Sequence, residues 1–243
     1  MNPYRRLKRA VGVTYYTVIS IPGAWREDPQ AAHYALPWFS SLLPGRSPLH
    51  DAVPWLSFRA VEWLEGHLRP DMRIFEYGSG GSTLFFAQRV REVASVEHDR
   101  AWHEAVAAEL AQRGVANCVY RLVEPEPAEG VGTDTGSYLS RHPYYQGLTF
   151  ARYVQSILAY EDASFDLVLI DGRARIACAD TALAKVKPGG YLILDNMERD
   201  EYQIARSLLA ALPCIDISGI LPYGRPHWSV TTVWRKSAAQ SLP

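Results

Sequence analysis

The sequence predicts an α/β protein built on a doubly wound, mostly parallel sheet, and two observations carry this prediction. The first is a short apolar run that leads into a glycine turn and then a helical run, RIFEYGSGGST over residues 73–83. The second is a series of further apolar runs that end in an acid, at Glu97, Asp171 and Asp195. Buried parallel strands are near-continuous apolar runs that alternate with helices along the chain.

The composition is that of a folded domain without a strong charge bias. Of the 243 residues 48% are hydrophobic and 21% are charged, which leaves enough apolar material for a sizeable core. Lys and Arg number 25 against 26 Asp and Glu, so there is no overall basic field and we expect no nucleic-acid partner. Three cysteines lie far apart without a CxxC pair, which is typical of buried thiols and predicts a cytoplasmic protein.

Residues 1–56 are predicted to be an N-terminal extension. It begins with a basic segment over residues 1–10, followed by an apolar stretch from Val11 to Ile21. Polar and aromatic residues dilute that stretch and no small-residue cleavage site follows, so a signal peptide is disfavoured. Packing on the domain, packing on a second copy in a homo-oligomer, and membrane-surface contact by residues 1–21 stay open. No apolar run approaches the ~20 residues of a transmembrane segment.

The second part of the extension, residues 22–56, is rich in proline and in aromatic residues. Proline at this density prevents long helices. Aromatic rings need apolar cover, which argues against a solvated linker. We therefore expect an irregular arm laid over the domain, which either serves as structural cover or walls the substrate pocket.

Residues 57–236 read as one domain of alternating helices and strands. A helix begins at Ser57 with an apolar stripe and stops before Pro70. Asp99 is predicted to be the N-cap and Gly114 the C-cap of a later helix. The remaining elements of this half are strand Arg73–Glu76, helix Ser82–Val90, strand Arg91–Glu97, helix Arg100–Arg113 and strand Val119–Val123.

An insertion over residues 125–150 interrupts the pattern. It is first polar and rich in Gly and Pro and then aromatic, and a loop this long is usually functional or disordered. It leaves the end of a strand on the ligand face of the sheet, so we predict a substrate-covering lid. Glu124, just before it, is a candidate partner of an adenine amino group or an ordinary loop residue.

The second half completes a seven-stranded sheet with an antiparallel hairpin at its edge. The run Phe165–Ile170 is almost wholly apolar, as a central parallel strand should be. The predicted elements are helix Ala151–Tyr160, helix Ile176–Val186, turn Lys187–Gly190, strand Tyr191–Leu194, helix Glu198–Ala211 and the hairpin strands Cys214–Ile220 and Ser229–Arg235. Residues 237–243 are predicted to be a tail.

The residues in and after the glycine turn favour a ligand with a ribose but without the pyrophosphate of a dinucleotide. A dinucleotide fingerprint needs a third glycine where this chain has Thr83, which counts against a pyrophosphate. Glu97 follows Gly78 by nineteen residues (97 − 78), at the tip of the next strand, where an acid can accept both ribose hydroxyls. An NAD-type oxidoreductase stays an alternative, with Glu76 and Thr83 against it.

Four segments, EYGSGGS, SVEHD, FDLVLIDG and VKPGGYLILDN, carry a family resemblance. Through their order and spacing, residues 57–236 resemble the class I S-adenosylmethionine-dependent methyltransferases, whose fold is Rossmann-like. The family's usual third glycine is Ser82 here. The resemblance implies S-adenosylmethionine as cofactor, bound by Glu76, Gly78, Ser79, Gly80, Ser82, Glu97, His98 and Asp171. It implies methylation, for which we expect a hydroxyl of a small molecule or sugar; a non-catalytic cofactor-binding scaffold is the alternative.

Asp171 and Asp195 are the predicted catalytic residues, since reacting groups sit at the carboxyl ends of the strands. With Asn196 they resemble the Mg²⁺ ligands of catechol and caffeoyl-coenzyme A type O-methyltransferases. A lysine that those families carry after the first aspartate is missing here. In the reading without metal, Asp171 contacts cofactor or substrate, and Asp195 polarises the acceptor or caps a loop.

Further polar residues are expected near the same edge. Arg173 and Arg175 follow the fourth strand and are candidates for pairing with an anionic substrate group. The loop over residues 221–228 should overhang the edge and offers Tyr223, Arg225 and His227. His227 is a candidate base or a surface residue.

Overall fold

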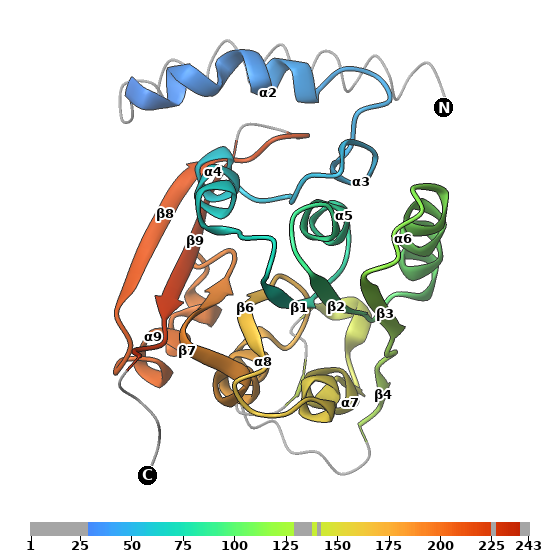
Figure 1. The fold of residues 1–243 in the computed structure, drawn as a ribbon, viewed down its shortest axis with the longest axis vertical. Coiled ribbons are helices and arrows are strands. Elements are labelled where there is room, and N and C mark those ends of the chain that lie inside the picture. Colours follow the sequence, from blue (N-terminus) through green and yellow to red (C-terminus); the bar gives the residue numbers. More distant parts are fainter. Residues whose placement is uncertain (1–28, 129–137, 140–141, 225–226, 239–243) are drawn as a thin grey trace.

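A seven-stranded sheet runs through the centre of the protein in the order β3-β2-β1-β6-β7-β9-β8 (Figure 1). The computed structural model describes residues 29–128, 138–139, 142–224 and 227–238. Neighbouring strands from β3 to β7 are parallel, and β9 pairs antiparallel with both β7 and β8. The predicted mostly parallel sheet with an antiparallel edge hairpin is confirmed. The strands are β1 Arg73–Tyr77, β2 Glu92–Glu97, β3 Cys118–Leu122, β6 Phe165–Ile170, β7 Val186–Leu194, β8 Cys214–Ile220 and β9 Trp228–Arg235.

Helices cover both faces of this sheet. Side chains alternate along a strand, so Ile74 packs in the core on one face and Phe75 in the core on the other. On one side lie α4 Phe58–His67, α5 Gly81–Ala87 and α6 Arg100–Gln112 (Figure 1). On the other lie α7 Ala151–Gln155, α8 Arg175–Ala182 and α9 Ile204–Leu208.

Two helix starts are capped by polar side chains, of which Asp99 was predicted as an N-cap. The hydroxyl of Ser57 accepts a hydrogen bond from the Ala60 amide at 3.3 Å and begins α4. The carboxylate of Asp99 accepts from the Trp102 amide at 2.8 Å and begins α6. Gly114, with φ +65°, follows the end of α6 in the left-handed conformation that favours glycine.

Several element boundaries differ from the prediction. The helix expected over Glu198–Ala211 is only the turn η5 Asp200–Tyr202 and the short α9. The expected turn Lys187–Gly190 is an irregular part of β7, because the pairing with β6 jumps from Val186 to Tyr191. Gly190 lies so close to β6 that an added Cβ would be 2.7 Å from the Asp166 carbonyl oxygen. α5 is shorter than expected, and the two helices predicted at 151–160 and 176–186 finish as the turns η3 Ser156–Ala159 and η4 Leu183–Lys185.

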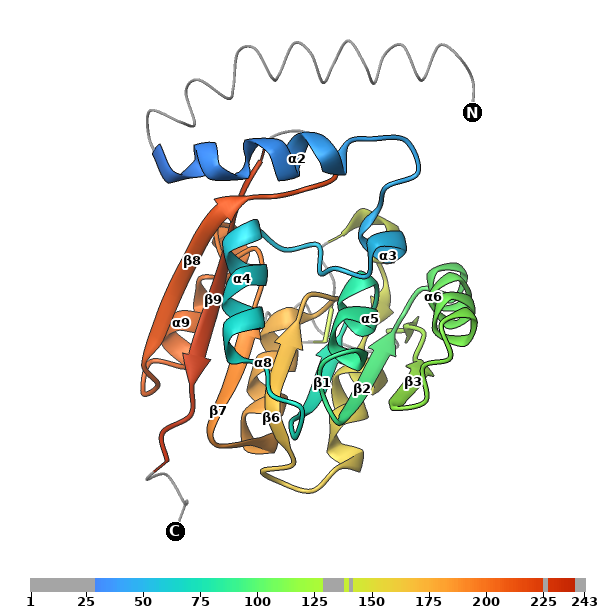
Figure 2. The ribbon, with the colours of Figure 1, turned by 45° about the horizontal axis from the view of Figure 1, so that its top comes forward.

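The arm is more regular than expected, although no long helix forms in its described part. It contains η1 Pro29–Tyr34, α2 Ala35–Ser41 and α3 Pro48–Asp51. Trp38 is buried in a small core with Tyr34 and Ile220 of β8. Figure 2 shows α2 lying across the side of the sheet towards which β1, β2 and β6 point. The arm therefore lies at the edge where the parallel strands end. In the described part of the chain no helix combines the length and apolarity needed to cross a membrane.

The insertion is also partly regular. Its two ends pair as a small antiparallel sheet of β4 Glu126–Pro127 and β5 Leu148–Thr149, with the turn η2 Pro143–Tyr145 between them. Tyr145 and Phe150 are buried in the core beneath α7. Residues 129–137 and 140–141 lie outside the described part, and the lid function stays a prediction.

Candidate functional site

The loop between β1 and α5 packs directly against the end of β6. Gly78 has φ +93°, a conformation that strains any other residue. A Cβ added to Gly78 would lie 2.8 Å from the backbone nitrogen of Gly172. Glycine is therefore needed at residue 78 both for the turn and for the close approach of the two loops.

Glu76 is buried in β1 and holds this loop in place through Thr83. Its Oε2 accepts hydrogen bonds from the hydroxyls of Thr83 at 2.6 Å and Ser95 at 2.7 Å. The Thr83 oxygen also accepts from the Gly80 amide at 3.0 Å, so Thr83 pairs with the backbone of the residue that precedes α5. Oε1 of Glu76 is buried without a hydrogen-bond partner among the described residues. Burial raises the pKa of Glu76 to about 7, against the lowering effect of its hydroxyl partners.

Glu97, at the end of β2, holds the same loop from the other side. Its Oε1 accepts from the amides of His98 at 2.7 Å and Asp99 at 2.9 Å. Its Oε2 accepts from the amide and the hydroxyl of Ser79, both at 3.0 Å. Burial acts to raise the pKa of Glu97, but the hydrogen bonds and His98 keep that pKa below its usual value. The carboxylate is therefore charged, and four donors occupy its acceptor positions.

Aromatic side chains surround the loop. Trp102 donates its indole N–H to the Ser79 carbonyl at 2.8 Å, and the Ser79 hydroxyl lies 2.6 Å from the Tyr120 hydroxyl. His98 has Nδ1 2.8 Å from Glu97 Oε1 and Nε2 2.9 Å from the hydroxyl of Tyr145. The predicted residues of the glycine loop and the two acids thus lie in one region. Ser95, Trp102, Tyr120 and Tyr145 were not predicted there, nor was the hydrogen bond from Thr83 to Glu76. For Ser95 a usable signal was its position as a lone small polar residue inside the apolar run EVASVE.

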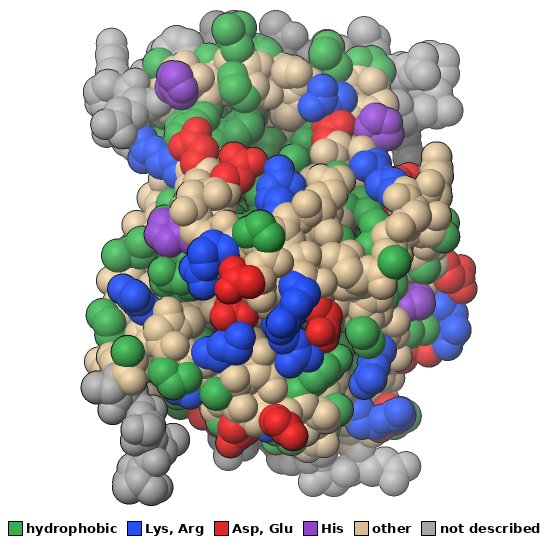
Figure 3. Space-filling model, in the orientation of Figure 1, with side chains coloured by type: hydrophobic (Ala, Val, Ile, Leu, Met, Phe, Trp, Pro, Cys, Tyr) green, Lys and Arg blue, Asp and Glu red, His purple; other side chains and the backbone are tan. Residues whose placement is uncertain are grey.

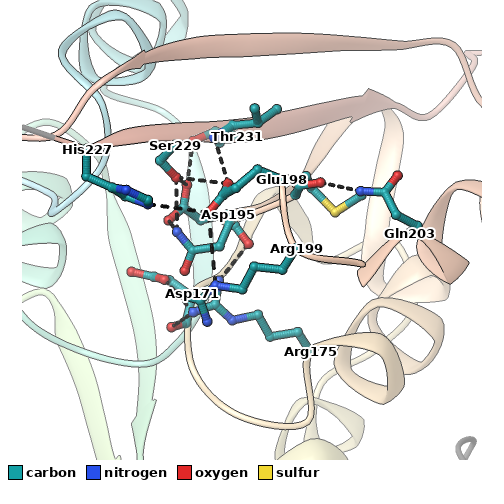
Figure 4. A network of polar contacts seen from close by, with 12 residues as sticks. Asp171, Arg175, Asp195, Glu198, Arg199, Gln203, His227, Ser229 and Thr231 are labelled. Carbon is teal, nitrogen blue, oxygen red and sulfur yellow. Dashed lines mark hydrogen bonds and ion pairs between the residues drawn. The ribbon is translucent and has the colours of Figure 1, made fainter. Parts of the chain in front are cut away.

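A second polar network lies at the ends of β6 and β7 (Figure 4). Asp195 is buried; its Oδ1 accepts from the Thr231 hydroxyl at 2.6 Å and its Oδ2 from the Asn196 amide at 2.9 Å. The Asn196 amide nitrogen also donates to the Ser229 hydroxyl at 3.0 Å. Burial, together with nearby Asp171, raises the pKa of Asp195 to about 7.

Arg175 ties the two strand ends together. Its buried guanidinium donates to the carbonyl oxygens of Asp195 at 2.6 Å, Asp171 at 2.9 Å and Gly172 at 3.0 Å. It also lies 2.9 Å from Asp171 Oδ1. Arg175 is therefore committed to the protein rather than to an anionic substrate group. The Arg173 guanidinium lies over the ring of Tyr145, 5.2 Å from its centroid.

The residues do not fit the expected Mg²⁺ site. Both oxygens of Asp195 already accept hydrogen bonds, Asn196 presents its nitrogen to Asp195, and Asp171 faces the cation of Arg175. Hard cations need free oxygen ligands, and a guanidinium beside them is repulsive. Within the described ranges no group of three or more His, Cys, Asp or Glu side chains is placed to hold a metal ion. No step is assigned to a metal.

The remaining candidates lie at the rim. The Tyr223 hydroxyl donates to Asp51 of the arm at 2.7 Å, and His227 is exposed with Nε2 4.0 Å from Glu198 Oε1. Arg225 lies outside the described residues. Glu124 is exposed and paired with Arg100 at 2.5 Å, as an ordinary surface residue is.

Comparison with known proteins gives structural likeness only. No protein-family model and no curated protein matches the chain. An O-methyltransferase from Bacillus cereus, solved in complex with SAH, is similar over 91% of this chain and 96% of its own, with 17% identity and a TM-score of 0.52. An rRNA methylase from Streptococcus thermophilus has 11% identity, coverage of 79% and 98%, and a TM-score of 0.49. A methyltransferase-like protein from Silicibacter pomeroyi has 27% identity, coverage of 75% and 86%, and a TM-score of 0.46.

Proposed function

Because the chain has the class I methyltransferase fold, we propose that it is an S-adenosylmethionine-dependent methyltransferase acting on a hydroxyl of a small molecule or sugar. The main support is that charged Glu97, at the end of β2, accepts a hydrogen bond from the Ser79 hydroxyl in the glycine loop that follows β1. An acid at this strand end is where the ribose of a nucleotide ligand binds in doubly wound sheets.

The residues around the loop can bind the adenosyl group if a ribose hydroxyl replaces the Ser79 hydroxyl on Glu97. The Ser79 hydroxyl has a second partner in Tyr120, so a ribose hydroxyl can replace it on Glu97 without leaving Ser79 unpaired. Gly80 leaves the loop open on one side, since an added Cβ would meet only Trp102 at 3.7 Å. Once Glu76, whose pKa is raised to about 7, has lost its proton, its unpaired Oε1 is an acceptor for the cationic end of the ligand.

Bound S-adenosylmethionine supplies an activated methyl carbon, so the protein's part is to align the acceptor and remove its proton. In this proposal Asp171 removes the proton; its position after β6, beside the glycine loop, and its 31% exposed side chain support that role. Arg175 orients this carboxylate through Oδ1. Asp195 is buried with both oxygens bonded, so in this proposal it positions β9 through Thr231 and Ser229 rather than accepting the proton.

Contacts of Thr83 and Asp171 count against the two alternatives, an NAD-type oxidoreductase and a non-catalytic scaffold. In an NAD-type oxidoreductase the third glycine allows close helix–strand packing, but here Thr83 fills that place with a buried hydroxyl bonded to Glu76. A non-catalytic scaffold would bind the cofactor without using Asp171, whose carboxylate is held in one orientation by Arg175.

Calorimetric titration of the purified chain with S-adenosylhomocysteine and with NAD⁺ tests the proposal. We expect saturable binding of S-adenosylhomocysteine and no heat with millimolar NAD⁺. Glu97→Gln should weaken that binding about 10- to 100-fold, since hydrogen bonds to a charged group are the strong ones.

Ser79→Ala is the matched control, because it removes a donor that competes for Glu97 and should leave the affinity unchanged or higher. Melting curves establish that both variants are folded. Binding of NAD⁺ alone, or a folded Glu97→Gln variant with undiminished affinity, would overturn the assignment.

A further inference from the structure

The arm carries an apolar surface that the described part of the protein does not cover. Leu36, Phe39 and Leu43 are 81%, 42% and 58% exposed. They are spaced by three and four residues, which places them along one face of α2 and the turn after it. We call these three residues the α2 apolar face. Figure 3 shows hydrophobic side chains gathered over α2.

The opposite face of α2 does have a partner. Trp38 and Ser41 are buried there, against Ile220 and the loop that follows β8. Singly exposed apolar residues are ordinary, but a contiguous set on an otherwise anchored helix marks an interaction surface. The α2 apolar face is therefore available for a contact outside the described fold.

The sequence before the arm indicates the chemistry of that contact. Residues 1–28 contain four arginines and one lysine against two acids, Glu27 and Asp28, and they include the apolar, tyrosine-containing stretch Val11–Ile21. These 28 residues lead directly into η1 and α2. Basic charge beside apolar and aromatic residues is typical of segments that bind anionic lipid surfaces. A second copy would bring like charges together, whereas anionic headgroups complement them.

The arm is fixed in place, so a contact at α2 also orients the domain. The Ser41 hydroxyl accepts from the Tyr223 amide at 2.9 Å, and Trp55 donates its indole N–H to the Pro222 carbonyl at 3.1 Å. Both partners belong to the loop between β8 and β9. A surface bound by α2 would therefore lie on the side of the sheet where the parallel strands end (Figure 2).

We propose that the α2 apolar face docks onto an anionic phospholipid bilayer, with residues 1–28 supplying the positive charge. The apolar side chains enter the interface between headgroups and acyl chains, and the basic residues contact the headgroups. This docking does not depend on whether the protein transfers a methyl group.

Co-sedimentation of the full chain with lipid vesicles tests the proposal. Vesicles of phosphatidylcholine with phosphatidylglycerol should bind the protein, and vesicles of phosphatidylcholine alone should bind it less. Binding to the anionic vesicles should weaken as salt rises, because salt screens the headgroup charge. The double variant Leu36→Ser/Phe39→Ser should bind anionic vesicles at least about tenfold more weakly, since it removes two side chains from apolar contact.

Ile204→Ser/Ile215→Ser is the matched control. It removes two apolar side chains of similar exposure from α9 and β8, away from the arm, and should leave vesicle binding unchanged. Absence of binding to anionic vesicles would overturn the proposal, as would equal binding by the α2 variant. Sedimentation equilibrium tests a third outcome. If the protein is a dimer and the α2 variant is a monomer while the control variant stays dimeric, the α2 apolar face binds a second copy and the lipid proposal is overturned.

Discussion

Gly81→Ala is expected to lower the free energy of unfolding by about 3 kcal/mol. A Cβ on Gly81 would lie 2.1 Å from the carbonyl oxygens of both Pro48 and Val53. These are backbone atoms of the arm, so the clash cannot be relieved by turning a side chain. The better helix propensity of alanine returns at most about 1 kcal/mol. Thermal or denaturant unfolding measures the difference, and a fall in Tm of roughly 6–12 °C corresponds to it.

Gly80→Ala is the adjacent control. Its backbone is extended, with φ 163°, and an added Cβ makes only an ordinary contact with Trp102 at 3.7 Å. Its free energy of unfolding should stay within about 0.5 kcal/mol of the natural protein. Because the open side of Gly80 is where the proposed ligand approaches, the affinity for S-adenosylhomocysteine should fall nevertheless. Equal stability of the two variants would contradict the close packing of the arm, at Pro48 and Val53, against Gly81 of α5.

Glu76→Gln should change how stability depends on pH. The pKa of buried Glu76 is raised from 4.5 to about 7. Between these values the unfolded chain has released the proton and the folded chain retains it, so stability falls as pH rises through this window. A shift of about 2.5 units (7 − 4.5) corresponds to about 3 kcal/mol. Glutamine does not titrate and still accepts hydrogen bonds, so the variant should lose correspondingly less stability between pH 5 and 8.

Denaturant unfolding at several pH values measures this slope. Asp195 has its pKa raised to about 7 by burial and contributes to the same window, so the variant should keep part of the slope. Glu161→Gln, which changes an exposed acid, should leave the slope unchanged. If the natural protein and Glu76→Gln lose stability in parallel as pH rises, Glu76 does not retain a proton in the folded state.

The strands were predictable because a central parallel strand is buried on both faces. The run FDLVLI is apolar throughout, and β6 has the predicted bounds Phe165–Ile170. The edge strand β8 also has its predicted bounds, Cys214–Ile220. The acids at Glu76, Glu97, Asp171 and Asp195 follow from the same pattern, since each lies at or beside the carboxyl end of a strand.

What could not be predicted depends on contacts between distant parts of the chain. The sequence could not show that the expected Mg²⁺ ligands are engaged within the protein, since Thr231, which donates to an oxygen of Asp195, is 36 residues away along the chain. From the sequence, Arg175 was a candidate partner for an anionic substrate group. Its guanidinium instead binds three backbone carbonyls, which come together only when the ends of β6 and β7 lie side by side in the fold. The arm forms short helices because α5 and β8 offer it surfaces that local composition cannot indicate.

A crystal structure of the protein with S-adenosylhomocysteine would show whether Glu97 binds the ribose. We expect a ribose hydroxyl within hydrogen-bond distance of Glu97 Oε2, with the Ser79 hydroxyl still bonded to that of Tyr120. A ribose bound away from Glu97, with the Ser79 hydroxyl still on that carboxylate, would contradict it.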